Sequence, residues 1–170
     1  MKIRPYIYGE DHISVASFGT DERTHALWSA NIFRYPLTQE GFEGKLRELE
    51  ANTGDMPFIA ENDNGEAVGF FSIELYNEGR DAMLKFVIVS PSHRGEGTGL
   101  QLVKAAAEYA FNNTTAGAVT LNVFSVNEKA RRCYAAAGFE EVSVEPSAFA
   151  YNGEMWGRCS MRLEADKWSR

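Results

Sequence analysis

The sequence is poor in cysteine and proline, with two and five among its 170 residues, and it has no long apolar run. The two cysteines, Cys133 and Cys159, fit no disulfide framework and are typical of a reducing compartment. No stretch approaches the roughly 18 apolar residues that a membrane-spanning helix needs. Residues 1–8 lack the apolar core of a signal peptide. These absences predict a soluble, cytoplasmic protein.

Basic side chains are also scarce relative to acidic ones. The chain has 17 Lys and Arg against 24 Asp and Glu, a formal net charge of −7. This field repels a polyanion, so nucleic acid is not expected as a partner, whereas small cations and basic peptides are attracted. The three histidines show no ligand-like spacing with each other or with the cysteines, so no metal site is expected.

Hydrophobic periodicity and turn residues predict the order of the elements. A strand at 2–8 is followed by a mostly helical segment to about residue 54, and then by three antiparallel strands within 58–89. The second half alternates: helix 97–112, strand 119–124, helix 128–137, strand 139–144 and strand 156–163. The pattern predicts one α/β (α+β) domain over 1–170, with a mixed, mostly antiparallel sheet of about seven strands and about four flanking helices.

The segment 87–100 carries the strongest chemical signal, because a buried strand runs through a glycine-rich turn directly into a helix. The first amides of a helix have no intrahelical acceptor and lie at the positive end of its dipole. Glycines allow a bulky anion to approach this backbone closely, and Arg94 adds a cation beside it. The segment therefore predicts a phosphate or pyrophosphate site.

Three kinds of anion-binding loop have glycine patterns that this segment could match. Nothing here matches the P-loop pattern G-x-x-x-x-G-K-[ST]. The dinucleotide fingerprint fails because Leu100 stands where its third glycine belongs after Gly95 and Gly97. The third pattern, [Arg/Gln]-x-x-Gly-x-[Gly/Ala], is met by Arg94, Gly97 and Gly99.

Together with Val89-Ser90-Pro91, this loop resembles the acyl-CoA pyrophosphate loop of the GNAT superfamily of N-acetyltransferases. The segment 126–139 is similar to the second signature of that family, Asn-x-x-Ala-x-x-x-Tyr-x-x-x-Gly-Phe. Residues 151–156 loosely resemble the ribosomal-protein N-terminal acetyltransferase branch, which also includes polyamine enzymes. The resemblance implies a GNAT-like fold, with an acceptor-side part at 1–55, an acetyl-CoA-binding core at 56–145 and a C-terminal strand region at 146–170.

In the family, the strand matching 82–89 diverges from the strand matching 119–124, and the acyl-pantetheine arm lies in the gap. The resemblance thus implies mostly backbone contacts to acetyl-CoA, with Asn127 near the pantetheine arm. The cofactor-binding residues implied are Val87, Ile88, Val89, Arg94, Gly95, Glu96, Gly97, Thr98, Gly99, Leu100 and Asn127. The alternative for Asn127 is a helix N-cap, with Ser125 and Glu128 as a competing capping box.

Acyl transfer to an amine poses two proton problems. The departing CoA thiolate benefits from a donor with a similar pKa, and a tyrosine phenol, with a pKa of about 10, meets this need. Tyr134 matches the family's tyrosine for this role, although it could also be a core residue of its helix. Asn122 occupies the position of the glutamate base of related enzymes, and an amide accepts no proton at neutral pH. Candidates for a remote or water-relayed base are Glu74, Glu154 and His25, and deprotonation of the amine in bulk water is a further route.

Other residues have plainer interpretations. Cys133 is expected to be a small packed side chain rather than a reactive thiol. The aromatic residues of the helical segment are expected to pack between helices, with some near the acceptor: Phe18, Trp28, Phe33, Tyr35 and Phe42. The acidic residues of the same segment are expected on a solvated face: Asp11, Asp21, Glu22, Glu40 and Glu43.

These observations predict an acetyl-CoA-dependent N-acetyltransferase in which a primary amine attacks directly. The expected acceptor is a protein or peptide N-terminus or a small cationic amine. The resemblance also implies a homodimer as one arrangement, because members of the family commonly pair through sheet edges or C-terminal strands. A non-catalytic acyl-CoA-binding module is the alternative, motivated by Asn122, and a nucleotide-binding regulator is a third interpretation. The identity of the acceptor, the acyl-chain preference and the general base stay open.

Overall fold

The computed structural model describes residues 1–168. The elements follow in this order: β1 (Lys2–Pro5), α1 (His12–Phe18), α2 (Glu22–Ser29), α3 (Gln39–Thr53), β2 (Met56–Glu61), β3 (Ala67–Tyr76), β4 (Asp81–Val89), α4 (Thr98–Asn113), β5 (Ala118–Phe124), α5 (Glu128–Ala136), β6 (Glu140–Tyr151) and β7 (Glu154–Glu164). Short 3₁₀ turns, η1 (Pro91–His93) and η2 (Ala165–Lys167), follow β4 and β7. The predicted α/β class and sheet are confirmed, with five α-helices in this part of the chain rather than about four. The additional helix arises because residues 12–53 divide into α1, α2 and α3.

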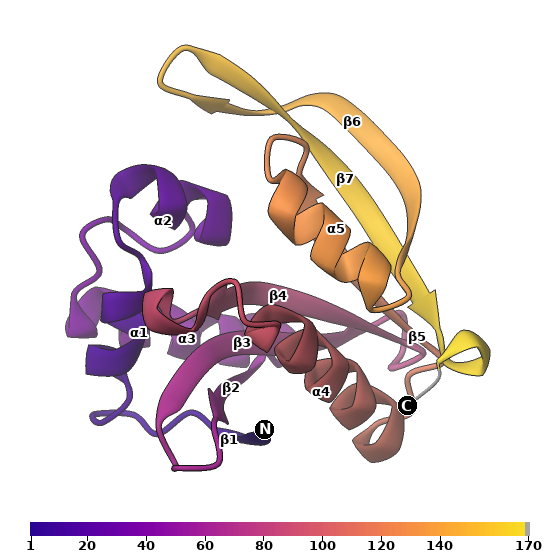
Figure 1. Cartoon of the computed structure of the whole chain (residues 1–170), viewed down its shortest axis with the longest axis horizontal. Helices are drawn as coiled ribbons and strands as arrows, with labels where there is room; N and C mark the ends of the chain where they lie inside the picture. The colour runs from indigo at the N-terminus through magenta and orange to yellow at the C-terminus, as the bar shows by residue number, and fades with distance from the viewer. Residues whose placement is uncertain (169–170) are drawn as a thin grey trace.

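The seven strands form one sheet in the order β1-β2-β3-β4-β5-β7-β6. Only β4 and β5 pair in parallel, and every other neighbouring pair in the described sheet is antiparallel. In Figure 1 the half formed by β1 to β4 and the half formed by β5 to β7 meet near the C-terminus and diverge away from it. The sheet is thus two antiparallel halves joined by one short parallel contact.

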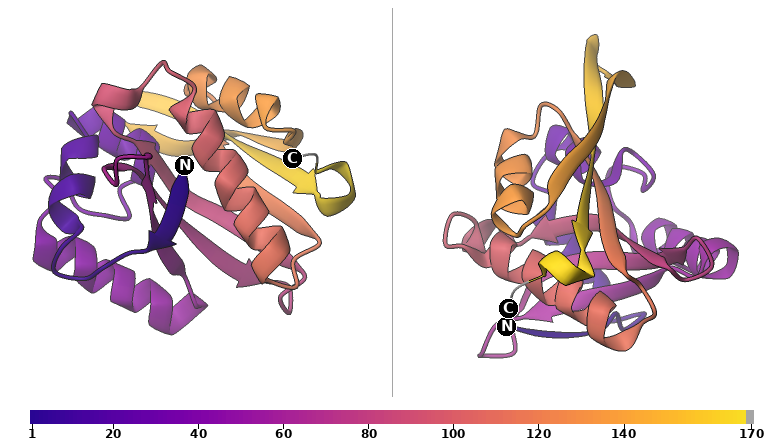
Figure 2. Two further views of the ribbon diagram at one scale, coloured as in Figure 1. Left: turned by 60° about the horizontal axis from the view of Figure 1, so that its bottom comes forward. Right: turned by 90° about the vertical axis from the view of Figure 1, so that its right-hand side faces the viewer.

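The helices cover the two faces of this sheet in separate groups. Helices α4 and α5 pack on one face, where Leu102, Val103 and Tyr134 join the largest hydrophobic cluster. Helices α1 and α3 cover the other face of the first half, where Phe18 and Phe42 are fully buried. The hairpin of β6 and β7 extends beyond both layers (Figure 2). A third cluster, formed by Ala26, Phe124, Tyr151 and Trp156, attaches this hairpin to α2.

Strand β1 ends at Pro5 rather than at the predicted residue 8, because the next amides turn toward buried carboxylates. Ile7 N–H donates to Asp11 Oδ2 at 2.7 Å, and Gly9 N–H donates to Glu43 Oε1 at 2.7 Å. Asp11 also forms an ion pair with Arg4, with 2.6 Å between Oδ2 and Nη1. The prediction of a solvated face is therefore wrong for Asp11 and Glu43, which are 6% and 5% exposed. Their burial is compensated by hydrogen bonds and an ion pair that join β1 to α1 and α3.

The predicted turns of the two hairpins are confirmed. Asn62 Oδ1 accepts from the amides of Asn64 and Glu66 between β2 and β3, and Gly153 has φ +82° between β6 and β7. Among the described residues, no helix is long and apolar enough to cross a membrane.

Candidate functional site

The central feature is a gap between β4 and β5. Their pairing covers Asp81↔Ala118, Ala82↔Val119 and Met83↔Thr120 and ends there. Beyond this point β4 pairs as a strand with β3, and β5 continues its pairing with β7 as far as Phe124. Backbone groups of the two strands therefore face each other across the gap without bonding. This is the divergence that the sequence resemblance implied for 82–89 and 119–124.

A β-bulge lies in β4 beside this gap. The register with β3 shifts between Phe70 and Ser72, and Phe86 has φ +53°, which is rare for an aromatic residue. The extra residue reverses the alternation of side chains: Ala82 and Leu84 pack on the α4 side, whereas Phe86 and Ile88 pack on the α1 and α3 side. Val87 and Val89 consequently pack toward α4.

Trp28 of α2 holds this bulge in place. Its indole N–H donates to the carbonyl oxygen of Phe86 at 2.7 Å. No local pattern signals the bulge, because residues 82–89 are apolar on both alternating sets except for Lys85 and contain no glycine. Trp28 was expected only as a packing residue, and the bond adds a role at the edge of the gap.

The glycine-rich loop leads from β4 into α4 beside the open end of the gap. Gly95 and Gly97 have φ values of +87° and +83°, and Gly97 is the N-cap of α4. No side chain caps this helix end, so its first amides stay open to a ligand. A Cβ atom at Gly97 would meet nothing within 4 Å, so the glycine serves the backbone conformation and the open approach.

Arg94 lies next to this loop but is held by the protein itself. Its Nε donates to the carbonyl of Val89 at 3.0 Å, and its Nη2 donates to the carbonyl of Phe18 at 2.6 Å. Desolvation lowers the pKa of Arg94, although it stays a cation at neutral pH. The side chain ties the end of β4 to the end of α1, beside the loop rather than over it. Glu96, Thr98 and Leu100 lie in or directly after the loop, at the start of α4.

Asn127 is the N-cap of α5, which decides between the two capping alternatives. Its side chain accepts from the amide of Ala130 at 3.3 Å. Ser125 instead accepts from the amide of Gly157 in β7 at 3.0 Å. The start of α5 lies just after the open end of β5, so Asn127 stands beside the gap.

Tyr134 lies on α5 and is 8% exposed, with its ring against Phe139. Desolvation, with a smaller contribution from Cys133, raises the pKa of Tyr134 and keeps the phenol protonated at neutral pH. A Cβ atom at Gly99 would lie 3.6 Å from Cys133 Sγ, so α5 is in contact with the first turn of α4. Burial raises the pKa of the Cys133 thiol as well, in agreement with its expected packing role.

A groove of about 410 Å³ opens on the sheet face opposite α4 and α5, where the parallel pairing ends. Met83 and Thr120, the last parallel pair, line it together with Asn122, Arg158 and Ser160. The Ser160 hydroxyl donates to Asn122 Oδ1 at 2.7 Å. The two faces of the gap thus differ: glycine-rich backbone lies on one side, and polar side chains lie on the other.

None of the three candidate bases is a free group at this groove. His25 is 1% exposed, and its Nε2 lies 2.7 Å from the carbonyl of Phe33. Glu74 Oε2 takes the Lys85 ammonium at 2.9 Å. Glu154 is paired with Arg23, and the hydrogen bonds from Arg23 and Trp156 lower its pKa to about 2. A group with this pKa is a poor base at neutral pH.

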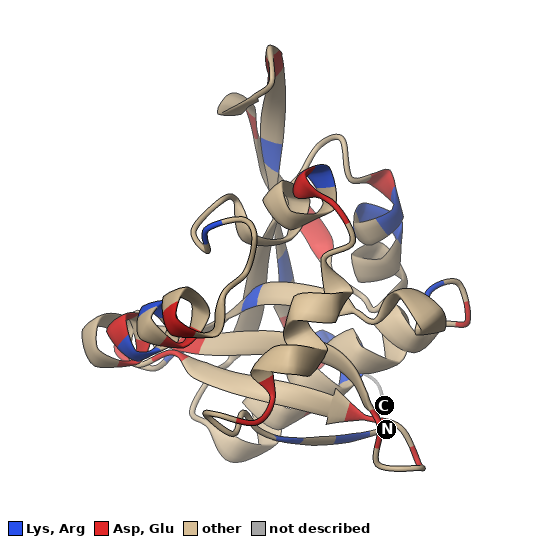
Figure 3. Ribbon diagram, turned by 90° about the vertical axis from the view of Figure 1, so that its left-hand side faces the viewer, with Lys and Arg blue, Asp and Glu red and all other residues tan. Residues whose placement is uncertain are grey.

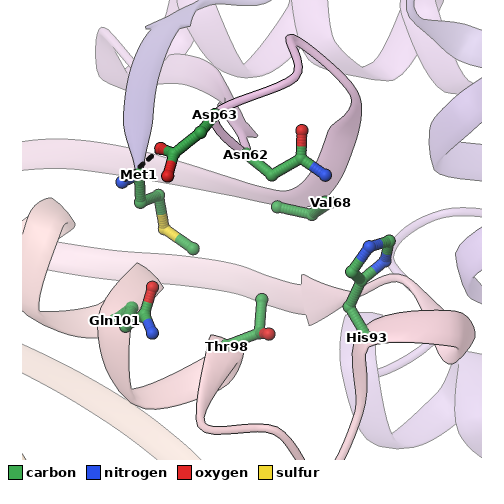
Figure 4. Close-up of a pocket in the computed structure, with 7 residues that line it drawn as sticks. All are labelled: Met1, Asn62, Asp63, Val68, His93, Thr98 and Gln101. Atoms are coloured by element: carbon green, nitrogen blue, oxygen red, sulfur yellow. Dashed lines mark ion pairs between the residues drawn. The ribbon is translucent and has the colours of Figure 1, made fainter.

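A second depression, of about 100 Å³, lies between the β2–β3 turn and the start of α4 (Figure 4). Figure 4 shows His93, Thr98 and Gln101 on one side and Asn62 and Asp63 on the other. At about 30 Å³ per water molecule it holds a few waters and no nucleotide. Within residues 1–168, no group of three or more His, Cys, Asp or Glu side chains could hold a metal ion.

Comparison with known proteins places this arrangement in context. The sequence profile of the acetyltransferase (GNAT) family matches residues 23–139. Streptothricin acetyltransferase of Streptomyces lavendulae is 30% identical over 101 residues, which cover 59% of this chain and 50% of that protein. The uncharacterised N-acetyltransferase YhfO of Bacillus subtilis is 34% identical over 116 residues, 65% of this chain and 75% of that protein. The chain thus spans half the length of the first relative and three quarters of the second.

Solved structures share the fold over nearly the whole chain. Spermidine N-acetyltransferase from Vibrio cholerae, in complex with CoA and spermine, superposes with a TM-score of 0.83 at 21% identity. The superposition covers 98% of this chain and 96% of that one. A chimera of that enzyme with hSSAT superposes with a TM-score of 0.80, also at 21% identity.

Proposed function

This chain belongs to the acetyltransferase (GNAT) family, and we propose on this basis that it transfers an acetyl group from acetyl-CoA to a primary amine. The observation that carries the proposal is the gap between β4 and β5, which ends beside the uncapped, glycine-rich start of α4. A gap between two strands that are not hydrogen-bonded to each other suits an extended amide-containing chain, and open helix amides suit its diphosphate.

The residues present fit acetyl-CoA, which supplies an activated thioester acyl group. In the proposed arrangement the backbone of Val87, Ile88 and Val89 binds the pantetheine amides and polarises the thioester carbonyl. The amides of 95–100 bind the pyrophosphate, with Arg94 fixing the loop and Asn127 beside the pantetheine arm. The bulge at Phe86 supports this assignment, because it directs the strand after it toward the α4 side of the gap.

The proposed reaction is direct attack without a covalent enzyme intermediate. The nitrogen of the free amine forms a bond to the thioester carbon, the carbon–sulfur bond breaks, and Tyr134 gives its phenolic proton to the departing thiolate. The amine proton passes to water, since Asn122 is not a base and the carboxylate of Glu154 is engaged by Arg23. A proton from water then restores the phenol of Tyr134. Burial raises the pKa of Tyr134, so the phenol is protonated before transfer.

A non-catalytic acyl-CoA-binding module is not favoured, because both curated relatives carry acetyltransferase names. Spermine is bound in the Vibrio cholerae structure, and streptothricin names the other relative, so small amines are the proposed acceptor class. The cytoplasmic location, the homodimer and the division at 1–55, 56–145 and 146–170 stay predictions from the sequence.

The experiment that tests the proposal measures CoA released from acetyl-CoA, by chromatography, with and without a pool of amines. For Tyr134→Phe we expect kcat to fall at least about tenfold while acetyl-CoA affinity is unchanged, because general acid catalysis contributes roughly 10²–10⁴-fold. Tyr109→Phe, a change of the same kind on α4 where the ring packs on Phe58, is the matched control and should keep full activity. Amine-independent release, or equal rates for both variants, contradicts the proposal.

A further inference from the structure

The amide of Asn122 presents the hydrogen-bond donors of its Nδ2 group to the groove at the gap. Its oxygen is occupied by the Ser160 hydroxyl at 2.7 Å, across the β5–β7 register in which these two residues are partners. The two N–H donors of Nδ2 therefore point away from Ser160. Asn122 is exposed and lines the groove, so these donors are open to a ligand. A donor in this place repels an ammonium group and attracts a carboxylate or carbonyl oxygen.

The rest of the groove has the same character. Among the described residues that line it, the charged ones are Arg158 and Arg162, and no carboxylate is present. Carboxylates outside the lining hold these arginines: Glu145 binds Arg158 at 2.6 Å, and Asp81 and Glu164 bind Arg162 at 2.9 Å and 2.6 Å. The bonds that Arg158 makes within residues 1–168 use Nη2, which leaves other N–H groups of its guanidinium for a ligand.

The carboxylates on the far side of β4 already bind an ammonium of the protein itself. Asp55 and Glu74 both bind the ammonium of Lys85, at 2.9 Å each, and Asp55 also accepts from Ser72. In Figure 3 acidic and basic segments are interspersed over the ribbon, so the net charge of −7 is not concentrated at one place. The overall charge is therefore a poor guide to the acceptor, and the local donors decide.

We infer that the acceptor is an amine that also carries a carboxylate, as an amino acid does, and that Asn122, Ser160 and Arg158 select it. This inference rests on the proposed acetyl transfer and gives its acceptor class. It separates this chain from an enzyme for polyamines, whose additional ammonium groups need acidic partners that the groove does not provide. An ammonium-binding site needs a hydrogen-bond acceptor at position 122, whereas a carboxylate-binding site needs a donor there.

The test uses two pairs of amines that differ by a carboxylate alone: ornithine against putrescine, and lysine against cadaverine. We expect kcat/KM to be at least tenfold higher for the member with the carboxylate in both pairs. Calorimetric binding of the same four amines to the CoA-loaded protein gives a second readout that does not require turnover. Equal or tighter binding and equal or faster turnover of putrescine and cadaverine overturn the inference.

Two variants examine the assigned residues. Asn122→Asp replaces the donor with a carboxylate and should reduce the ornithine-to-putrescine ratio at least tenfold. Asn113→Asp makes the same change at the exposed end of α4, where the side chain bonds to the Tyr109 carbonyl, and should leave the ratio unchanged. A ratio that shifts equally in both variants contradicts a role for Asn122. Binding of ornithine without any acetyl transfer supports the inference and contradicts the proposed function, so the two failures are distinguishable.

Discussion

At the scale of single residues, the hydrogen bond from Trp28 to Phe86 links α2 to β4. Among the residues of the described strands, only Phe86 has a positive φ. Its carbonyl oxygen accepts a hydrogen bond from the Trp28 indole of α2 at 2.7 Å. Trp28 also stacks on Phe33, with ring centroids 5.3 Å apart. Packing and a directional bond thus act together on the conformation of β4 beside the gap.

Replacing Trp28 with Phe removes the N–H and leaves the Phe86 carbonyl without its partner. We expect the free energy of unfolding to fall by about 1–3 kcal/mol, the cost of an unpaired buried polar group. Because the bulge sets the backbone of Val87, the KM for acetyl-CoA should rise several-fold. Denaturant unfolding and steady-state kinetics measure the two effects.

Phe42→Leu is the control for this change, since it loses packing against Trp28, with ring centroids 6.2 Å apart, but keeps the bond to Phe86. It should reduce stability without raising the KM for acetyl-CoA. An equal rise of KM in both variants would show that packing alone, and not the hydrogen bond, supports β4.

At the scale of elements, the start of α4 combines a left-handed glycine cap with open amides. Gly97 has φ +83°, and a Cβ there would meet no described residue within 4 Å apart from its own neighbours in the chain. A substitution therefore acts through backbone conformation rather than through a clash. This separates the conformational demand of the loop from the packing of the helix behind it.

For Gly97→Ala we expect a loss of about 1–2 kcal/mol in the free energy of unfolding, the cost of a left-handed conformation for a residue with a Cβ. If the loop changes conformation to avoid this cost, acetyl-CoA affinity falls as well, because the amides lose their alignment. Gly44→Ala is the matched control: the position lies within α3, has open space and lacks a positive φ. It should stabilise the protein by about 0.5–1 kcal/mol and leave acetyl-CoA affinity unchanged, as calorimetry can measure.

At the scale of the whole molecule, α2 joins the two halves of the sheet across the open end of the gap (Figure 1). Trp28 attaches it to β4, and Ala26 packs against Phe124 and Trp156 in the other half. Arg23 adds an ion pair with Glu154 at 2.7 Å and lies over the Trp156 ring, 5.0 Å from its centroid. The parallel contact of β4 and β5 is short, so these attachments fix the width of the gap at its open end.

The ion pair with Arg23 makes this attachment dependent on pH. The pKa of Glu154 falls from its usual 4.5 to about 2, because Arg23 and the Trp156 indole donate hydrogen bonds to the carboxylate. A lowered folded-state pKa contributes stability above the unfolded pKa, and this contribution is lost as the pH falls toward the folded pKa. The stability difference between the native protein and Glu154→Gln should therefore narrow as the pH is lowered from about 5 to about 3.

Urea unfolding at several pH values measures this difference. Glu140→Gln, which removes an exposed carboxylate paired with Lys167 at the other end of β6, is the control for the loss of one negative charge. A difference that stays constant over this pH range contradicts the assigned role of Glu154.

Much of the fold follows from local patterns in the sequence. Several elements depend only on neighbouring residues: strand 67–76 and the turns at 62–65 and 152–153. The start of α4 after its glycines is also local, and so is the end of α5 at Gly138, which has φ +98°. The same holds for the two motifs, because glycines, helix starts and the spacing of Asn127 and Tyr134 are properties of contiguous segments. Alternation and capping chemistry act over a few residues and are therefore readable without the fold.

The sequence by itself determined the glycine-rich loop, the helix that carries Tyr134 and the order of the strands along the chain. Only the tertiary structure decided that the pairing of β4 and β5 stops at Met83↔Thr120, that Trp28 holds Phe86, and that Ser160 occupies the oxygen of Asn122. It also decided that Asp11 and Glu43 are buried. The contacts of Glu43, Trp28 and Asn122 join residues 34 to 58 positions apart in the chain. Such pairings depend on how whole elements pack, which no local pattern encodes.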